Sequence, residues 1–282
     1  MCNEMGFVKS PLSYTGGKFK VLKDIYRLFP DSIHTFVDLF GGGFNVGVNA
    51  DAEIIIYNDT LTPVVNLLKH MNTTNTKTLL KELQNYIDEY QLNKENADGY
   101  FELRKHYNTS EEKHPMELYA LICHGFNNQI RFNSNGKFNI PFGKREFNPV
   151  LKEKFIDFVR EMHNKKIVFT NENFVKLKID KLQDNSFVYL DPPYLGSTAT
   201  YNEQGGWTEE DESALLSLLN RLSERGIAWA LSNNLKYNNP LLEAFLDSTE
   251  GIKEHYLGSY HTNCSYQKKD KSEDIEILVT NY

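Results

Sequence analysis

The 282-residue chain has only three cysteines, Cys2, Cys123 and Cys264, and no two of them form a C-x-x-C pair. A disulfide framework or a structural zinc site is therefore not expected, and a reducing cytoplasm fits the composition. No apolar stretch approaches the length of a membrane span, and the first residues lack the pattern of a signal peptide. We find no internal repeat and no low-complexity tract. These absences predict a cytoplasmic globular protein with no membrane partner.

The chain also has no excess of positive charge, since its net charge is −7. An acidic balance argues mildly against a nucleic-acid partner, but local basic clusters decide such contacts. Two clusters are present, one around Lys137, Lys144 and Arg145 and one at residues 268–271. Hydrophobic residues make up 40% of the chain, which is enough to build a full core. The length allows one large α/β domain, or a core domain with a smaller insertion.

Short apolar segments alternate with helical patterns along most of the chain. Strands of the buried, parallel type are predicted at residues 36–40, 54–57, 167–169, 187–190 and 227–231. Helices are predicted at residues 18–28, 61–70, 149–162 and 209–224. The alternation predicts an α/β fold with a doubly wound, mostly parallel, Rossmann-like sheet. Residues 256–260 and 275–280 predict a late antiparallel pair at its edge.

Residues 71–148 interrupt this alternation. The first part of the block is polar and helical, and the second part, residues 124–147, is rich in Asn, Gly, Phe and basic residues. A turn signal at Asn133-Ser134-Asn135-Gly136 predicts a β-hairpin there. The catalytic domain is therefore expected to be discontinuous, with residues 1–70 and 149–282 on either side of an inserted domain.

The tetrapeptide Asp191-Pro192-Pro193-Tyr194 directly follows a predicted buried strand. Open α/β sheets bind ligands at the carboxyl ends of their strands, so these residues are expected in the active site. The prolines stiffen the backbone and remove two donors. Asp191 and the carbonyl of Pro192 can then accept hydrogen bonds from one exocyclic amine, while Tyr194 offers a flat face for stacking. This combination suits methylation of the amino group of a nucleobase.

A glycine-rich turn, Gly41-Gly42-Gly43, follows the first predicted strand. Such a turn lets a nucleotide approach the backbone closely, although many glycine-rich turns are structural. Val46 stands where the dinucleotide fingerprint G-x-G-x-x-G has its last glycine, which disfavours a nicotinamide cofactor. A turn without pyrophosphate geometry suits S-adenosylmethionine.

Two further segments are candidates for the same cofactor. Asp59 follows the second predicted strand and is placed to accept the ribose hydroxyls, or else to cap the next helix. Near the start of the chain, Tyr14-Thr15-Gly16-Gly17-Lys18 precedes a predicted helix. Lys18 is a candidate partner for the methionine carboxylate, and Tyr14 for packing on the cofactor.

Several motifs, in this order, resemble those of the Dam-type (alpha-group) DNA adenine-N6 methyltransferases, in particular the members from T-even bacteriophages. They are the segment 14–18, the turn at 40–43, the segments 125–131 and 139–145, the tetrapeptide 191–194, the stretch 207–233 and the closing residues 276–282. The resemblance covers nearly the whole chain. It differs at Tyr14, where many members have Trp, and at Gln129, where related hairpins place another wedge residue.

The resemblance implies a methyltransferase sheet in which residues 71–148 form the target-recognition domain. It implies catalysis at Asp191, Pro192, Pro193 and Tyr194. It implies S-adenosylmethionine binding, with no metal, at Tyr14, Lys18, Asp38, Phe40, Gly41, Gly43, Asp59 and Asp191. The expected partner is double-stranded DNA, with GATC as the target, and a cognate restriction endonuclease is possible. The target adenine would have to leave the base stack, and no oligomer is required.

The predicted hairpin supplies the candidates for DNA contact, which are Asn128, Gln129, Arg131, Pro141, Lys144 and Arg145. Arg145 is the candidate for a bidentate contact to guanine, while Arg131 and Lys144 are expected to touch phosphates. Each of these basic residues could instead be a solvated surface charge, and Asn128 could cap a turn. The histidines have no metal-like spacing.

Three other interpretations stay open at this point. The amino-methylating motif is also compatible with an RNA or protein-amide substrate. A DNA-binding regulator could keep the fold without turnover. A nucleotide-dependent oxidoreductase is disfavoured by Val46 and by the Asp-Pro-Pro-Tyr motif. Residues 268–271 could contact DNA phosphates or form an exposed turn.

Overall fold

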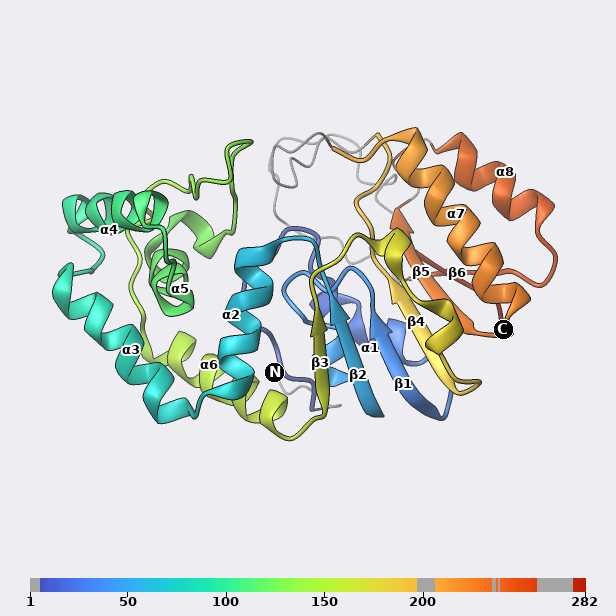
Figure 1. Cartoon of the computed structure of the whole chain (residues 1–282), viewed down its shortest axis with the longest axis horizontal. Coiled ribbons are helices and arrows are strands. Elements are labelled where there is room, and N and C mark those ends of the chain that lie inside the picture. Colours follow the sequence, from blue (N-terminus) through green and yellow to red (C-terminus); the bar gives the residue numbers. More distant parts are fainter. Residues whose placement is uncertain (1–5, 197–205, 235–236, 238, 258–275) are drawn as a thin grey trace.

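The computed structural model describes residues 6–196, 206–234, 237, 239–257 and 276–282. Its centre is a seven-stranded sheet in the order β3-β2-β1-β4-β5-β7-β6 (Figure 1). Only β7 runs antiparallel to its neighbours, so the predicted doubly wound, mostly parallel fold is confirmed. The strands are β1 Ile33–Asp38, β2 Ala52–Asn58, β3 Ile167–Thr170, β4 Ser186–Leu190, β5 Ala228–Asn234, β6 Lys253–Tyr256 and β7 Glu276–Thr280.

Alternate residues of the central strands enter two separate cores. Phe36 of β1 lies opposite Phe187 of β4, and both belong to the core on one face of the sheet. Val37 and Val188, one position further, are also opposite each other and belong to the core on the other face. Because successive strand side chains point to opposite faces, continuous apolar runs are the sequences that a sheet covered on both sides requires.

Helices cover both faces of the sheet. The second core includes residues of α7 (Glu209–Glu224) and α8 (Pro240–Ser248), while α2 (Thr62–Thr73) and α6 (Pro149–His163) contribute to the first. The helix predicted at 18–28 is shorter than expected. A 3₁₀ turn, Lys18–Lys20, is followed by α1, Leu22–Tyr26, because Val21 between them has non-helical dihedral angles.

The inserted block adds three helices, α3 (Thr76–Glu89), α4 (Ala97–Thr109) and α5 (Pro115–His124). They lie to one side of the sheet in Figure 1 and pack through α3 and α5 against α2 and α6. Their buried side chains belong to the same hydrophobic core as one face of the sheet. The block is therefore fixed to the sheet domain by apolar contact, through α2 and α6.

The hairpin predicted at 124–147 is present in an irregular form, because its two arms pair in antiparallel fashion without forming strands. Isolated antiparallel bridges join Gly125 to Phe142 and Phe132 to Phe138, and neither arm forms a strand. The predicted turn is present, since the side chain of Asn133 accepts from the backbone of Lys137 at 3.0 Å. Left-handed backbone at three non-glycine residues interrupts a regular ladder, at Asn127, Asn128 and Lys144.

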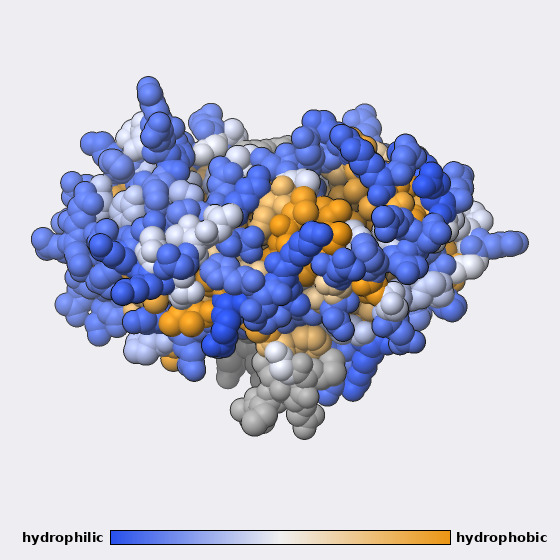
Figure 2. Space-filling view, turned by 60° about the horizontal axis from the view of Figure 1, so that its bottom comes forward, coloured by the Kyte–Doolittle hydropathy of each residue, from blue (hydrophilic) through white to orange (hydrophobic). Residues whose placement is uncertain are grey.

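The predicted antiparallel edge is confirmed, because β7 pairs with both β5 and β6. The segment predicted at 256–260 corresponds to β6, which begins three residues earlier; residues 258–260 lie outside the described part of the chain. Within that described part, no helix combines the length and apolar character needed to cross a bilayer. Figure 2 shows a largely hydrophilic face with an apolar area near its middle.

Candidate active site

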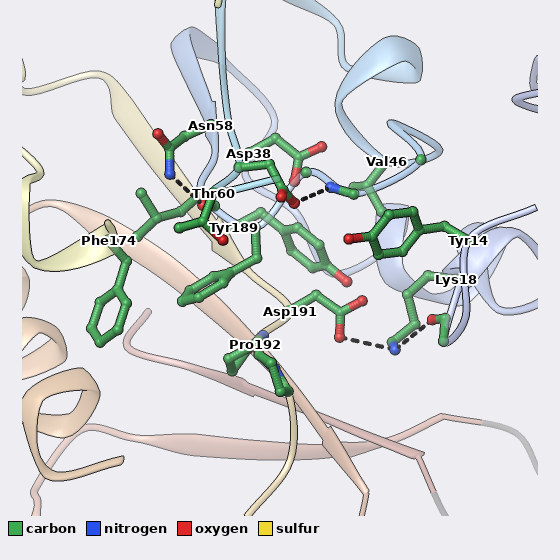
Figure 3. Close-up of a pocket in the computed structure, with 18 of the residues that line it drawn as sticks. Tyr14, Lys18, Asp38, Val46, Asn58, Thr60, Phe174, Tyr189, Asp191 and Pro192 are labelled. Atoms are coloured by element: carbon green, nitrogen blue, oxygen red, sulfur yellow. Dashed lines mark hydrogen bonds and ion pairs between the residues drawn. The ribbon is translucent and has the colours of Figure 1, made fainter. Parts of the chain in front are cut away.

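A cavity of about 390 Å³ lies at the carboxyl ends of β1, β2 and β4. Figure 3 shows its lining side chains converging from segments that are far apart in the sequence. The lining comprises residues 14–18, 38–43, 45–46, 58–60, 173–174, 189, 191–193, 206–207 and 211. All eight predicted cofactor residues are in this set. Their convergence on one cavity is an observation, and their binding roles stay predictions.

The glycine turn after β1 is held by the second strand. Gly42 has a φ of +46°, its N–H donates to Oδ2 of Asp59 at 2.9 Å, and its carbonyl accepts from the hydroxyl of Tyr57 at 2.8 Å. A Cβ on Gly41 would lie 2.3 Å from the ring of Tyr57. The N–H and the carbonyl of Gly42 are thus both hydrogen-bonded. Glycine is required at Gly42 by the backbone conformation and at Gly41 by the lack of space.

Asp59 has a structural contact as well as a place in the pocket wall. Its Oδ1 accepts from the backbone N–H of Leu61 at 2.8 Å, which closes a turn just before α2. The alternative of a helix cap at Asp59 is not realised, because the N-cap of α2 is Leu61 and has no side-chain cap bond. Burial raises the pKa of Asp59 above its usual value, and the backbone donors oppose that shift. A carboxylate oxygen has more than one lone pair, so these bonds leave Asp59 able to accept ribose hydroxyls.

Asp38, the last residue of β1, is almost completely buried at the pocket wall. Its Oδ2 accepts from the backbone N–H of Gly47 at 2.9 Å. Burial raises its pKa to about 7, with Asp191 and Asp59 adding repulsion and the Gly47 donor opposing it. Asp38 therefore changes charge near neutral pH, next to the predicted cofactor site.

This shift predicts how stability depends on pH. The folded protein keeps the Asp38 proton up to about pH 7, whereas the unfolded chain loses it near pH 3.8. The free energy of unfolding therefore falls as the pH rises between these two values. The total loss in the free energy of unfolding is at most about 4 kcal/mol. In Asp38→Asn the loss should disappear. Urea unfolding from pH 4 to 8 should show that the free energy of unfolding of the variant, relative to that of the wild type, increases up to about pH 7 and is constant above it. A pH-independent difference would contradict the assignment.

Lys18 and Asp191 form a buried ion pair at one side of the pocket (Figure 3). The ammonium lies 2.9 Å from Oδ1 of Asp191, 3.0 Å from the carbonyl of Gly16 and 3.7 Å from Oε2 of Glu276. Burial alone would lower the pKa of Lys18, but the two carboxylates hold it above its usual value. Burial raises the pKa of Asp191, and Lys18 opposes the rise. The predicted lysine thus contacts Asp191, the predicted catalytic carboxylate, directly.

The tyrosine of the tetrapeptide is oriented by the same group. The hydroxyl of Tyr194 donates to Oδ1 of Asp191 at 3.3 Å and to Oε2 of Glu276 at 3.4 Å. The ammonium of Lys18 lies 5.3 Å from the centre of its ring. The sequence pattern gave Glu276 no site role. It is the first residue of β7, and the 82 positions between it and Tyr194 hide their contact in the sequence.

An aromatic wall on the other side of the pocket was also missed. Phe40 lies 5.3 Å from Phe174 and 5.8 Å from Trp207, between ring centres, and the latter two rings are 5.5 Å apart. Trp207 donates to a carboxylate oxygen of the buried Glu212, which fixes its ring. The three residues come from separate segments, so only the fold assembles the wall.

The predicted DNA-contact residues separate into two groups. Gln129, Pro141, Lys144 and Arg145 are exposed. Asn128 and Arg131 are half-buried and bound within the loop: Asn128 donates to the carbonyls of Ile122 and Cys123 at the end of α5, and Arg131 donates to Asn139. The capping alternative for Asn128 is therefore realised, and the DNA roles of all six residues stay predictions.

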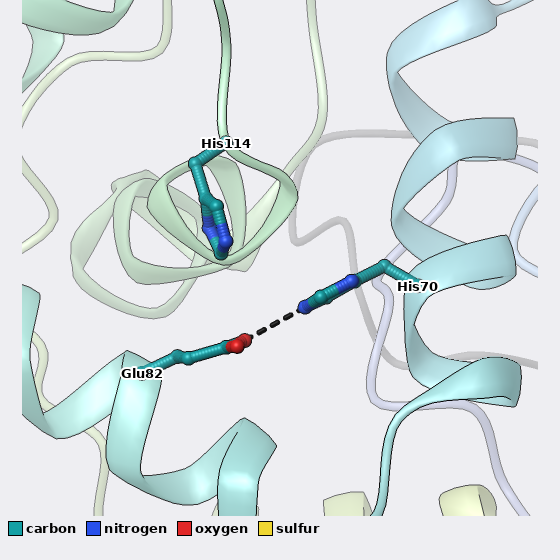
Figure 4. A group of neighbouring side chains, drawn as sticks. All are labelled: His70, Glu82 and His114. Carbon is teal, nitrogen blue, oxygen red and sulfur yellow. Dashed lines mark hydrogen bonds and ion pairs between the residues drawn. The ribbon is translucent and has the colours of Figure 1, made fainter.

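Figure 4 shows His70 of α2, Glu82 of α3 and His114 at the start of α5, a trio within the inserted block and adjoining α2. Their ligand atoms lie within 4.8 Å of one another. Nδ1 of His114 accepts from the backbone N–H of Met116 at 3.2 Å, and burial lowers the His114 pKa. Neutral His114 then has its proton on Nε2, which is a donor and not a metal ligand. We interpret the trio as a contact between helices, in which His70 and Glu82 are hydrogen-bonded at 2.7 Å and the ring of His114 packs edge-on against that of His70.

The sheet order with its reversed β7, and the pocket at the carboxyl ends of its strands, define the α/β methyltransferase class. Within it, the chain belongs to the D12 class N6 adenine-specific DNA methyltransferase family, which it matches over residues 14–264.

Relatives agree with this assignment. The chain is 40% identical to the type II methyltransferase M.FokI of Planomicrobium okeanokoites and 37% identical to the modification methylase StsI of Streptococcus sanguinis, in each case over 98% of the chain and 43% of the relative. It is 28% identical to the DNA adenine methylase of Escherichia coli K12, over 79% of the chain and 80% of that enzyme. The chain thus spans less than half the length of the first two relatives.

Proposed function

We propose that the chain transfers a methyl group from S-adenosylmethionine to the N6 amino group of adenine in double-stranded DNA. The observation that carries the proposal is the position of Asp191-Pro192-Pro193-Tyr194 beside the pocket lined by every predicted cofactor residue. Membership of the adenine methyltransferase family supports the choice of substrate. The relative named DNA adenine methylase supports the choice of DNA.

The pocket fits S-adenosylmethionine in its chemistry. Gly41, Gly42 and Gly43 all line the cavity, so a ligand can approach their backbone. Gly42 also packs closely on Tyr14, because a Cβ there would lie 3.0 Å from the Tyr14 ring. The aromatic wall of Phe40, Phe174 and Trp207 suits the adenine ring, and Asp59 suits the ribose. When bound, the cofactor supplies an activated methyl group on a sulfonium centre.

Asp191 is the residue we assign to the target amino group. Among the described residues, Lys18 and Tyr194 both bind its Oδ1, so Oδ2 is the oxygen best placed to accept from the amino group. The carbonyl of Pro192 accepts the second amino hydrogen. These two acceptors draw the nitrogen toward tetrahedral geometry and localise its lone pair for attack. Positioning and electrostatic stabilisation together provide the rate.

The adenine reaches this position only outside the helix stack. Extruding a base costs about a few kcal/mol, and stacking on an aromatic side chain returns about 1–3 kcal/mol. We assign the stacking to Tyr194, because its ring is held beside Asp191 by the bonds of its hydroxyl. The inserted block would then contact the bases around the extruded adenine.

For the target sequence we propose GATC, which rests on the resemblance to Dam-type enzymes, including those of T-even phages. For the biological setting we propose a modification methylase that accompanies a restriction endonuclease, because M.FokI and StsI carry such names. Either of these two assignments can be wrong while the proposed methylation of adenine N6 is still right.

The test is transfer of labelled methyl from S-adenosylmethionine to plasmid DNA, followed by base analysis and by sequencing that locates methylated adenines. Label on N6 of adenine at every GATC would support the whole proposal. Label on adenine in another sequence would keep the chemistry and overturn the target. No label on any duplex, with the cofactor bound, would favour an RNA or protein-amide substrate or a DNA-binding regulator.

A further inference from the structure

Glu276 connects the last strand of the sheet to the proposed catalytic tetrapeptide. It is the first residue of β7, lies opposite Asn234 of β5 and is 29% exposed. Its Oε2 is 3.7 Å from the ammonium of Lys18 and 3.4 Å from the hydroxyl of Tyr194, and its Oε1 is 3.5 Å from Nδ2 of Asn234. The side chain thus reaches two of the groups that also bind Asp191.

We propose that Glu276 is a positioning residue for methyl transfer, which fixes Lys18 and Tyr194 against Asp191. The inference rests on the proposed function, and it adds a residue outside the Asp-Pro-Pro-Tyr motif to the machinery of the reaction. Glu276 acts through its neighbours and need not touch the substrate.

The surroundings of Lys18 support this role. An ammonium group has three N–H donors, and three oxygens surround this one: the carbonyl of Gly16, Oδ1 of Asp191 and Oε2 of Glu276. The Lys18 side chain is only 4% exposed, so water cannot easily replace a missing partner. With the three acceptors coming from different segments, the ammonium has one preferred position, and that position determines where Oδ1 of Asp191 is held.

Tyr194 is fixed by the same pair of carboxylates. Its hydroxyl lies within hydrogen-bond distance of both Asp191 and Glu276. Asp191 follows β4 and Tyr194 lies in the loop beyond it, whereas Glu276 is part of a strand paired on both sides. A contact from a paired strand to a loop restrains the loop, so Glu276 orients the ring on which the adenine is to stack.

Glu276 also influences the charge of the site. The negative charge of Glu276 lies close to Asp191, and a like charge opposes the ionisation of a carboxyl group. The charged and titratable groups acting with Asp191 are Lys18, Tyr194, Glu276, Asp38 and Tyr189. Neutralising Glu276 should therefore lower the pKa of Asp191 and let it stay ionised in more acid solution.

The experiment compares the wild-type chain with Glu276→Gln, Glu276→Ala and the control Glu254→Gln, an exposed glutamate on the neighbouring strand β6. Single-turnover methyl transfer to plasmid DNA is followed from pH 5 to 9, together with S-adenosylmethionine affinity and Tm. Glu276→Gln should slow transfer about tenfold, and Glu276→Ala up to about a hundredfold, since displaced reacting groups cost that much. Cofactor affinity should stay within about threefold of the wild-type value, which is well below a tenfold change in Kd.

The pH profile separates positioning from a merely structural contact. In Glu276→Gln the acid limb of the rate should move to lower pH, whereas Glu254→Gln should match the wild type. A wild-type rate with an unmoved limb would overturn the inference. Slower transfer that merely follows a lower Tm, again with an unmoved limb, would also overturn it. If the wild type itself methylates no DNA, the proposed function fails instead, and the two failures are distinguishable.

Discussion

Asp191→Asn is expected to lower the single-turnover rate of methyl transfer about a thousandfold, the upper range for loss of one preorganised electrostatic contact. The amide keeps the size of the side chain and one acceptor oxygen. It loses the negative charge that pairs with Lys18 at 2.9 Å, and its NH₂ group would face either Lys18 or the target amine, both of which are donors. The change therefore removes the negative charge and one of the two acceptor oxygens while preserving the shape of the pocket.

Binding and chemistry have to be measured separately for this variant. Titration with S-adenosylmethionine should give an affinity close to that of the wild type, because the turn at Gly42 and the aromatic wall are unchanged. Asp184→Asn is the matched control, since Asp184 is exposed just before the same strand. A rate within threefold of the wild type in Asp191→Asn would rule out Asp191 as the acceptor for the amino group.

The parts of the fold that could be predicted from sequence are those set by local pattern. Apolar runs such as Phe187–Leu190 identify buried strands, and the tetrapeptide after β4 is contiguous, so its position at a strand end followed directly. The late antiparallel pair was recognisable for the same reason. The hairpin at 124–147 could be recognised from its turn signal, but it pairs only through isolated bridges, and Asn127, Asn128 and Lys144 in its arms have left-handed backbone.

The missed site residues depend on contacts between distant segments. Glu276 and Trp207 begin stretches that resemble the family but carry no assigned role there, and Phe174 lies in no motif. Each becomes informative only when the fold brings it to the pocket or to the groups beside it. Lys18 was expected to meet the cofactor, yet its direct ion pair with Asp191 could not be inferred, because 173 positions separate the two residues. Pattern thus identifies the groups that carry chemistry, and topology decides which of them share a proton or a charge.

In the proposed function the inserted block reads the target sequence, and Arg145 is the residue whose loss should show this role. Its guanidinium is exposed and donates to Oδ1 of Asn127 at 3.1 Å, which holds the planar group at the loop surface. A bidentate contact to guanine is worth about 1–3 kcal/mol of discrimination. Arg145→Ala should therefore reduce the preference for the target over a duplex with one changed base pair by about 5- to 150-fold.

Two further variants identify the origin of that loss. Arg145→Lys keeps the charge but not the planar fork, so it should lose most of the discrimination while keeping binding to unrelated DNA. Lys137→Ala removes an exposed cation from the turn of the same loop and should weaken all duplexes alike. Competition binding with matched and altered duplexes at one salt concentration measures all three. If Arg145→Ala behaves like Lys137→Ala, Arg145 contacts phosphate, and the bases are read by other residues of the loop.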